Sequence, residues 1–116
     1  MSIQRLKTND RMSQAVIHGD TVYLAGQVAL TARGESVTAQ TTAILAQIDA
    51  LLAEAGTDKS KALSATIWLA SMDDFAEMNA VWDEWSKGGN APCRACVESR
   101  LASPDFTVEI GVIAAL

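Results

Sequence analysis

Hydrophobic and polar residues alternate along five stretches of the chain, which is the pattern of strands with one buried face. The first two, Gln14–His18 and Thr21–Leu30, are separated by Gly19-Asp20, a pair typical of a tight turn between antiparallel strands. The others are Ala62–Ser71, Cys93–Arg100 and Phe106–Ala115, and a short strand at Ile3–Leu6 would precede them all. The alternation therefore predicts a sheet of five or six strands.

Two other segments repeat apolar residues at the spacing of an α-helix. The first begins at Thr38, a residue type that often caps helix N-termini, and ends at Gly56, which suits a helix C-terminus. Its apolar face is formed by Ile44, Leu45, Ile48, Leu51, Leu52 and Ala55. This pattern predicts a helix that packs on the sheet through one face.

The second helical segment follows the strand at Ala62–Ser71 and ends at Gly88-Gly89. Ser71, followed three residues later by Asp74, resembles a capping box in which Asp replaces the usual Glu. The apolar face of this segment is formed by Phe75, Met78, Trp82 and Trp85.

The order of the predicted elements is β-β-α-β-α-β-β, which indicates a single α+β domain over residues 1–116. Two helices are too few to cover both faces of a sheet this wide, so we expect both on one face. The other face must be buried in another way, and we expect it to pack against other copies of the same chain. The short connection over residues 101–105 favours a hairpin between the last two strands.

Composition and charge narrow the possible functions. With 116 residues, 49% apolar and 20% charged, the chain can bury one globular core but not two. The net charge is −5 and the nine Lys and Arg are scattered, which argues against the clustered basic surface of a protein that binds nucleic acid or an anionic membrane. No apolar run approaches the roughly 20 residues of a membrane span, and residues 1–10 do not resemble a signal peptide. With only two cysteines, these features predict a cytoplasmic protein.

Cys93 and Cys96 form a C-x-x-C pair inside a segment with strand alternation. A redox pair of this spacing belongs at a helix N-terminus, whereas in a strand the odd separation sends the two side chains to opposite faces. His18 is the only histidine, so four zinc ligands cannot be assembled within one chain. We therefore expect no metal and no cofactor, although Cys96 could still contact a ligand.

Arg94 lies between these cysteines, and Glu109 is the one charge in the apolar strand that ends the chain. Alternation places Arg94 on the face of Cys96, and Glu109 on the face of Gly111, which would leave space beside the carboxylate. Buried charges are poor stability devices, because each ion loses its hydration. The two residues could pair with each other, or Arg94 could bond to a carbonyl oxygen of another subunit. Alternatively, the two residues act on a substrate. The guanidinium of Arg94 can bind a carboxylate through two parallel hydrogen bonds. A partly desolvated Glu109 can accept and donate protons.

Two further positions are candidate ligand contacts. Gly26, in the segment Leu24–Gln27, could let a ligand approach the backbone or could mark a β-bulge. Asn79 lies one residue off the apolar stripe of the second helix, where it could reach a ligand or bond locally.

The segment PCRACVESRLASPDFTVEI, from Pro92 to Ile110, resembles the signature of the RidA/YjgF family of reactive-intermediate imine deaminases. That signature is Pro-x-Arg-small-x-apolar, followed further on by an apolar-Glu-Ile group. AGQV at 25–28 and DDFAEMNAVWDEW at 73–85 also fit, so the similarity covers essentially the whole chain. RMSQAVIHGD and APCRACV are more similar to the YoaB-like branch than to RidA proper.

The resemblance implies a chorismate-mutase-like α+β fold that assembles as a homotrimer with clefts between subunits. In that fold the strand from the middle of the chain lies between the last two strands, so the hairpin favoured above yields to this order. The trimer would also cover the second face of the sheet.

Matched residue by residue, the resemblance assigns Arg94 to the family arginine that holds the substrate carboxylate. Glu109 matches the glutamate that positions or activates water. Cys96 and Asn79 match residues of the pocket, and Gly26 matches a position where backbone lines it.

Two positions depart from the family pattern. Met12 and Ala25 stand where RidA proper has a tyrosine and a serine. The loss of two hydroxyls implies less hydrogen bonding to the substrate and room for a larger, more apolar substrate side chain.

The implied activity is hydrolysis of 2-imino acids and enamines to 2-keto acids and ammonia, without a cofactor. The alternative is a non-catalytic protein that binds a keto acid or related carboxylate in the same cleft. A third interpretation, a ribonuclease or translation inhibitor as among some relatives, fits poorly with the acidic charge.

Overall fold

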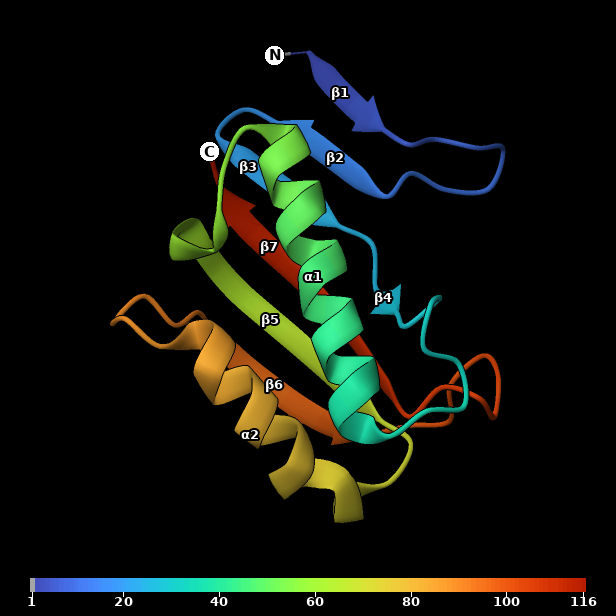
Figure 1. Ribbon diagram of the computed structural model, residues 1–116. Coiled ribbons are helices and arrows are strands. Elements are labelled where there is room, and N and C mark those ends of the chain that lie inside the picture. The colour runs from blue at the N-terminus through green and yellow to red at the C-terminus, as the bar shows by residue number, and fades with distance from the viewer. Residues whose placement is uncertain (1) are drawn as a thin grey trace.

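The computed structural model describes residues 2–116 and contains one sheet with two helices on one of its faces (Figure 1). The helices are α1, Val37–Ala55, and α2, Phe75–Ser86. The strands are β1 (Ile3–Leu6), β2 (Ala15–His18), β3 (Thr21–Leu24), β4 (Gln27–Val28), β5 (Ala62–Leu69), β6 (Cys93–Glu98) and β7 (Val108–Ala115). The α+β class with both helices on one face is therefore confirmed. Neither of these helices is long and apolar enough to cross a bilayer.

The strands follow the order β1-β2-β3-β7-β5-β6, and the short β4 pairs with β7. β5 and β6 run parallel, whereas every other pair is antiparallel. A parallel pair needs a long crossover, which α2 supplies between β5 and β6. The hairpin expected across residues 101–105 is therefore wrong, because β5 lies between the last two strands, as the resemblance implies. The sheet has seven strands because Ile3–Leu6 forms and Thr21–Leu30 divides in two.

The N-cap of helix α1 lies two residues before the cap expected at Thr38. Ser36 is the N-cap, and its hydroxyl oxygen accepts a hydrogen bond from the backbone N–H of Ala39 at 3.1 Å. The helix ends at Gly56, as predicted, with a φ of +91° that only glycine adopts without strain. Thr38 instead uses its backbone N–H and hydroxyl to donate to Glu77 of α2, which ties the two helices together.

The capping box expected at Ser71 and Asp74 does not form. Ser71 caps a short 3-10 helix, Met72–Asp74, by accepting from the backbone N–H of Asp73 at 3.2 Å. Asp74 makes no side-chain capping bond to α2. The shorter Asp side chain explains why the reciprocal bond of a capping box is missing.

The strand predicted over Thr21–Leu30 is interrupted at Ala25 and Gly26. Tyr23 pairs with Ile113 and Gln27 pairs with Ile110, so three residues of this segment face two residues of β7. This count defines a β-bulge, which is one of the two roles considered for Gly26.

The helix side of the sheet carries the core. Alternate residues of the central strands point toward the helices and are buried: Ala65, Ile67, Leu69, Val108, Ile110 and Val112. They belong to one cluster with apolar residues of the helices, among them Ile44, Ile48, Leu52, Met78 and Trp82.

The other side of the sheet, which we call the open face, is covered by neither helix (Figure 1). Tyr23, Val97 and Ile113 lie on it and are 46%, 46% and 36% exposed. Trp68 lies between them on β5 and is half-buried. A sheet face with this many exposed apolar side chains favours burial against another protein surface.

Candidate active site

Arg94 and Glu109 project from opposite faces of the sheet. Arg94 pairs with Ala65 of β5, and Glu109 pairs with Trp68 of the same strand. Because side chains alternate along a strand and these two partners are three residues apart, Arg94 points to the helix side and Glu109 to the open face. The ion pair between them that the sequence allowed does not form in residues 2–116.

Arg94 lies on the edge strand β6, beside α2, and its side chain is exposed. Its Nη1 donates a 2.7 Å hydrogen bond to Oδ1 of Asn79. The guanidinium carbon lies 5.4 Å from the ring centroid of Trp82 and 5.8 Å from that of Phe75, within the range of cation–π attraction. None of the ion pairs in the described chain involves Arg94, so the outer N–H groups of its fork can receive a carboxylate from solution.

Cys96 shares the face of Arg94 and is partly buried against the core. Burial raises the pKa of the Cys96 thiol, and the nearby positive charge of Arg94 opposes this only in part. A thiol with a raised pKa stays protonated at neutral pH, so Cys96 is a poor nucleophile and suits the wall of a pocket. Cys93 projects from the opposite face, and its Sγ donates to the carbonyl oxygen of Leu63 at 3.2 Å. We call Asn79, Arg94 and Cys96 the Arg94 cluster.

Glu109 is half-buried on the open face, with the backbone of Gly26 against its side chain. A Cβ atom at position 26 would lie 3.1 Å from Cδ of Glu109 and would overlap the carboxylate, so a larger residue there would force the Glu109 side chain to move. The sequence suggested that Gly111 makes this space, but a Cβ atom there would make an ordinary 3.5 Å contact with the ring of Trp68. Gly26 is therefore the residue that makes room for the carboxylate. We call Ala25, Gly26 and Glu109 the Glu109 cluster.

Three glutamine side chains, which we call the glutamine chain, support the bulge from the helix side. The Nε2 group of the buried Gln27 donates to the carbonyl oxygen of Ala25 at 3.1 Å and to Oε1 of Gln14 at 2.9 Å. Gln47 of α1 donates to Oε1 of Gln27 at 3.2 Å and to the carbonyl oxygen of Val28 at 3.0 Å. Sequence reasoning missed Gln27 and Gln47. The signal available for Gln27 was a polar residue at a core-facing position of an apolar strand.

Met12 lies in the loop between β1 and β2 and is 41% exposed. Oδ1 of Asn9 shapes this loop by accepting from the backbone N–H groups of Arg11 and Met12 at 2.8 and 3.0 Å. Two residues after Met12, the carbonyl oxygen of Gln14 accepts from the backbone N–H of Ala25 at 2.9 Å. The loop is thereby bonded to Ala25, the other position where the resemblance expects a hydroxyl.

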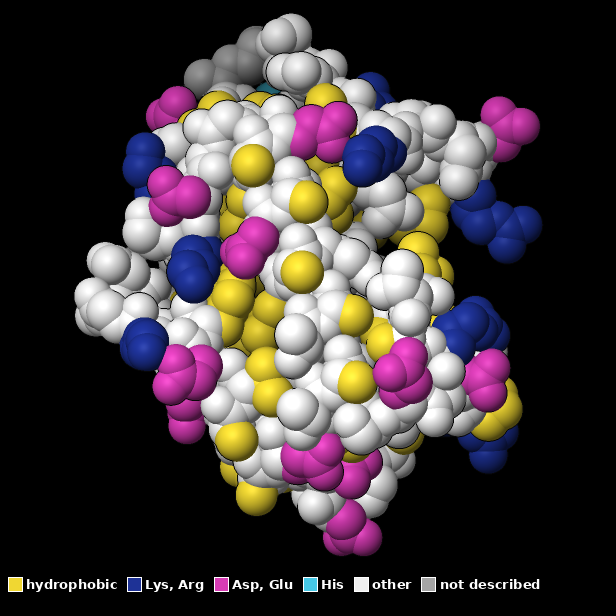
Figure 2. Space-filling view, in the orientation of Figure 1, with side chains coloured by type: hydrophobic (Ala, Val, Ile, Leu, Met, Phe, Trp, Pro, Cys, Tyr) yellow, Lys and Arg dark blue, Asp and Glu magenta, His cyan; other side chains and the backbone are white. Residues whose placement is uncertain are grey.

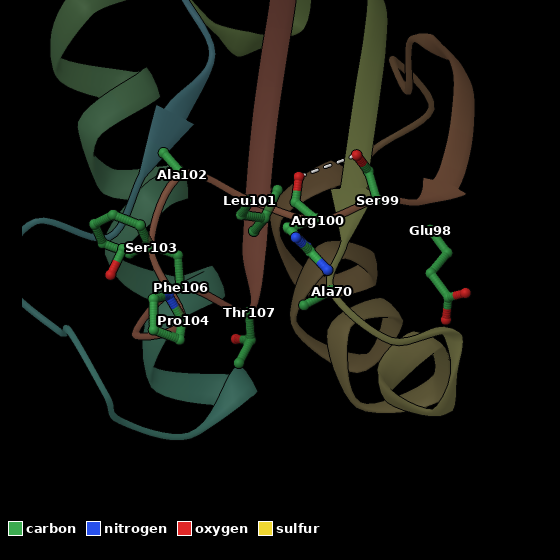
Figure 3. Close-up of a pocket in the computed structure, with 10 residues that line it drawn as sticks. All are labelled: Ala70, Glu98, Ser99, Arg100, Leu101, Ala102, Ser103, Pro104, Phe106 and Thr107. Atoms are coloured by element: carbon green, nitrogen blue, oxygen red, sulfur yellow. Dashed lines mark hydrogen bonds between the residues drawn. The ribbon is translucent and has the colours of Figure 1, made fainter.

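A groove of about 780 Å³ lies elsewhere, between the end of β5 and the connection from β6 to β7 (Figure 3). The side chain of Arg100 points into it, and Leu101 and Thr107 line it. The groove contains none of the residues predicted for the site, and sequence reasoning singled out none of its residues. We place the candidate site at the Arg94 and Glu109 clusters, because they hold the residues that the sequence singled out and each places a charged group next to a polar or backbone partner.

The surface on the helix side carries Lys and Arg side chains interspersed with Asp and Glu (Figure 2). No broad basic area appears on this side, in keeping with the net charge of −5. This arrangement offers no track for a nucleic-acid backbone on the face viewed.

Comparison with known proteins gives one consistent result. The family model described as Endoribonuclease L-PSP matches residues 2–116. A RutC family protein of Haemophilus ducreyi is 45% identical over 114 residues, which cover 98% of this chain and 97% of that protein. The RutC family protein YoaB of Escherichia coli is 44% identical over 116 residues and is covered completely.

Solved structures agree with this result. The crystal structure of a YjgF family member from Neisseria meningitidis superposes with a TM-score of 0.95 at 47% identity, covering 99% of this chain and 95% of that one. The fold described above is therefore shared with proteins of recognisable sequence similarity along the full length of the described chain.

Proposed function

The chain belongs to the Endoribonuclease L-PSP family, which includes the RutC and YjgF proteins, and on this premise we propose that it hydrolyses 2-imino acids and their enamine tautomers to 2-keto acids and ammonia. The membership predicted from the sequence, in the RidA/YjgF family and with YoaB-like features, is confirmed by these matches. The reaction and the site residues are the proposal.

The proposed site lies between copies of the chain, in a chorismate-mutase-like homotrimer. The observation that supports this arrangement is the position of Arg94 and Glu109 on opposite faces of one sheet. Within one chain the sheet separates them, so a small ligand cannot touch both. A second copy packed on the open face can bring its own Arg94 cluster to Glu109, and the exposed Tyr23, Val97 and Ile113 supply apolar surface for that packing.

In the proposed complex, Arg94 binds the carboxylate of the imino acid through two parallel hydrogen bonds. Asn79 and the rings of Phe75 and Trp82 already hold the guanidinium from the side, so little side-chain freedom is lost when the ligand arrives. The protonated, uncharged thiol of Cys96 forms part of the pocket wall beside the substrate. The C=N carbon, adjacent to the bound carboxylate, is thereby presented to a group on the neighbouring copy.

Glu109 of the neighbouring copy acts as the general base and acid. Its carboxylate accepts a proton from water as the oxygen adds to the iminium carbon, which gives a carbinolamine. It then returns this proton to nitrogen and accepts the hydroxyl proton of the carbinolamine as the C=O bond forms, the C–N bond breaks and ammonia leaves. Ammonia takes that proton from Glu109 and departs as ammonium, which restores the carboxylate. Imines hydrolyse unaided, so orientation of substrate and water supplies enough acceleration, and no covalent nucleophile is required.

The family name Endoribonuclease L-PSP points to ribonuclease activity, but the charge of this chain argues against it. A net charge of −5 and the interspersed charges on the helix side disfavour a polyanionic substrate, whereas the single guanidinium of the Arg94 cluster suits a small monoanion. The alternative, a non-catalytic protein that binds a keto acid or related carboxylate, also uses Arg94. It differs from the enzyme in that it does not need Glu109 to transfer protons.

The proposal is tested by generating imino acids in situ with an amino-acid oxidase in the presence of semicarbazide. An active deaminase diverts the imine to keto acid and lowers the rate of semicarbazone formation. A panel of imino acids with small, aliphatic and aromatic side chains would show which substrate the enzyme prefers. Hydrolysis rates equal to the uncatalysed rate for every imino acid in the panel would contradict the proposal.

A further inference from the structure

The peptide bond between Ala25 and Gly26 is held on one side only. The carbonyl oxygen of Ala25 accepts the 3.1 Å hydrogen bond from Nε2 of Gln27. In the preceding peptide, the N–H of Ala25 donates to the carbonyl oxygen of Gln14. The N–H of Gly26 makes no backbone hydrogen bond in residues 2–116. One peptide unit at the bulge therefore has an anchored acceptor and an available donor.

The orientation of this donor follows from peptide geometry. The described chain contains no cis peptide bond, so the N–H of Gly26 points opposite to the carbonyl of Ala25. The carbonyl points toward the Gln27 amide, and the N–H therefore points away from it. Because Gly26 lies against the side chain of Glu109, this donor is presented beside the carboxylate.

The amide of Gln27 has no freedom to turn over. It is 6% exposed, and both its donor group and its oxygen are occupied, by Ala25 and Gln14 on one side and by Gln47 on the other. Gln47 can donate to Gln27 only if the oxygen of Gln27 faces α1, which leaves its NH₂ group facing Ala25. The helix thereby sets the orientation of the Ala25–Gly26 peptide through two amides.

We propose that Gln27, supported by Gln47, is a positioning residue that orients the Ala25–Gly26 peptide so that the N–H of Gly26 donates to the reacting molecule beside Glu109. This inference rests on the proposed function and adds to it a residue with no contact to the substrate. An aliphatic side chain at position 27 would release the carbonyl of Ala25, and a glutamate, when ionised, could not donate to it.

The test compares leucine variants at three glutamines. Gln27→Leu should lower kcat for imine hydrolysis about tenfold while KM changes less than about threefold, because Arg94 still binds the carboxylate. Gln47→Leu should lower kcat by a smaller factor. The double variant should be no slower than Gln27→Leu alone, because both residues act through one peptide.

Gln40 provides a matched control on the same helix as Gln47. It is fully buried and makes three hydrogen bonds of similar length: its Nε2 donates to the carbonyl oxygens of Glu35 and Asp105, and its Oε1 accepts from the N–H of Thr107. Gln40→Leu should lower the melting temperature as much as Gln27→Leu yet leave kcat unchanged. Equal losses of kcat in the two variants, or an unchanged kcat in Gln27→Leu, would overturn the proposal.

A second measurement keeps this inference separate from the proposed reaction. In protein labelled with ¹⁵N-glycine, the amide resonance of Gly26 should shift in Gln47→Leu, which is distant in sequence and reaches this peptide through Gln27, and should stay in place in Gln40→Leu. If the wild-type protein hydrolyses no imino acid but this pattern appears, the reaction fails while the orienting role stands. An unshifted Gly26 resonance in Gln47→Leu would overturn the orienting role, whatever the activity.

Discussion

The backbone of Gly26 lies so close to the carboxylate of Glu109 that a single added methyl group would overlap it. This contact joins a bulge in one strand to the only acidic residue of β7, and it makes the position of the carboxylate depend on the glycine. It also supplies a direct test of the position of Glu109.

Gly26→Ala should displace the Glu109 side chain and lower kcat at least about tenfold, with a loss of stability on the order of 1 kcal/mol. Gly111→Ala is the matched control, because its added Cβ would make only ordinary contact with Trp68. Both variants are compared by imine hydrolysis and thermal unfolding. Equal activities of the two variants would contradict the contact.

Mixed oligomers test whether the site is shared between chains. Arg94→Ala and Glu109→Gln should each be inactive alone, because each lacks one half of every site. Random mixing in a trimer should restore about one quarter of the sites, since a site needs Arg94 from one type of chain and Glu109 from the other. Activity is measured after co-expression with two purification tags. No recovery, with mixed trimers present, would contradict a site shared between chains.

Asn79→Ala should weaken substrate binding without unfolding the protein. The 2.7 Å hydrogen bond that orients Arg94 is exposed, so its loss should raise KM about three- to tenfold and change kcat little. Arg94→Lys should raise KM further, because an ammonium group cannot make the paired hydrogen bonds of a guanidinium. The KM values of the two variants are compared by steady-state kinetics with one imino acid. A larger KM for Asn79→Ala than for Arg94→Lys would contradict the prediction.

Glu109→Gln separates the enzyme from the binding protein. The amide cannot act as a general base or acid near neutral pH, so hydrolysis should fall to near the uncatalysed rate, while calorimetric affinity for pyruvate should change less than about threefold. Wild-type rates in this variant would remove Glu109 from the mechanism.

The thiol of Cys96 should resist alkylation at neutral pH. Its pKa is raised by burial, so less thiolate is present at any given pH than for an exposed cysteine. The rate of reaction with iodoacetamide at Cys96, followed by mass spectrometry in Cys93→Ser, should rise only at a pH above the ordinary thiol range. The same shift lowers stability as pH rises through the pKa of the unfolded thiol, because the unfolded chain then releases its proton first. Rapid labelling at pH 7 would show that the thiolate is stabilised instead.

Local patterns predicted most of the elements, because alternation and helical spacing report which residues face the core. The terminal hairpin failed for a non-local reason: a short connection between two strands does not reveal that an earlier strand, β5, occupies the place between them. The single strand over Thr21–Leu30 failed because a bulge changes the register by one residue without changing the composition.

The candidate site shows the same division. Alternation correctly placed Arg94 with Cys96 and Glu109 with Gly111, each within its own strand. It could not relate the faces of β6 and β7, because that relation depends on how both pair with β5. The glutamine chain was invisible for a similar reason, since Gln47 and Gln27 meet only when α1 packs on β4.

The central place of β7 also governs how the chain folds. This strand pairs with β3, β4 and β5, and all three of these partners precede it in the sequence. The middle of the sheet therefore cannot close until residues 108–115 have joined it, and Glu109 arrives with them. Deletion of this strand would separate β3 from β5 rather than trim an edge of the sheet.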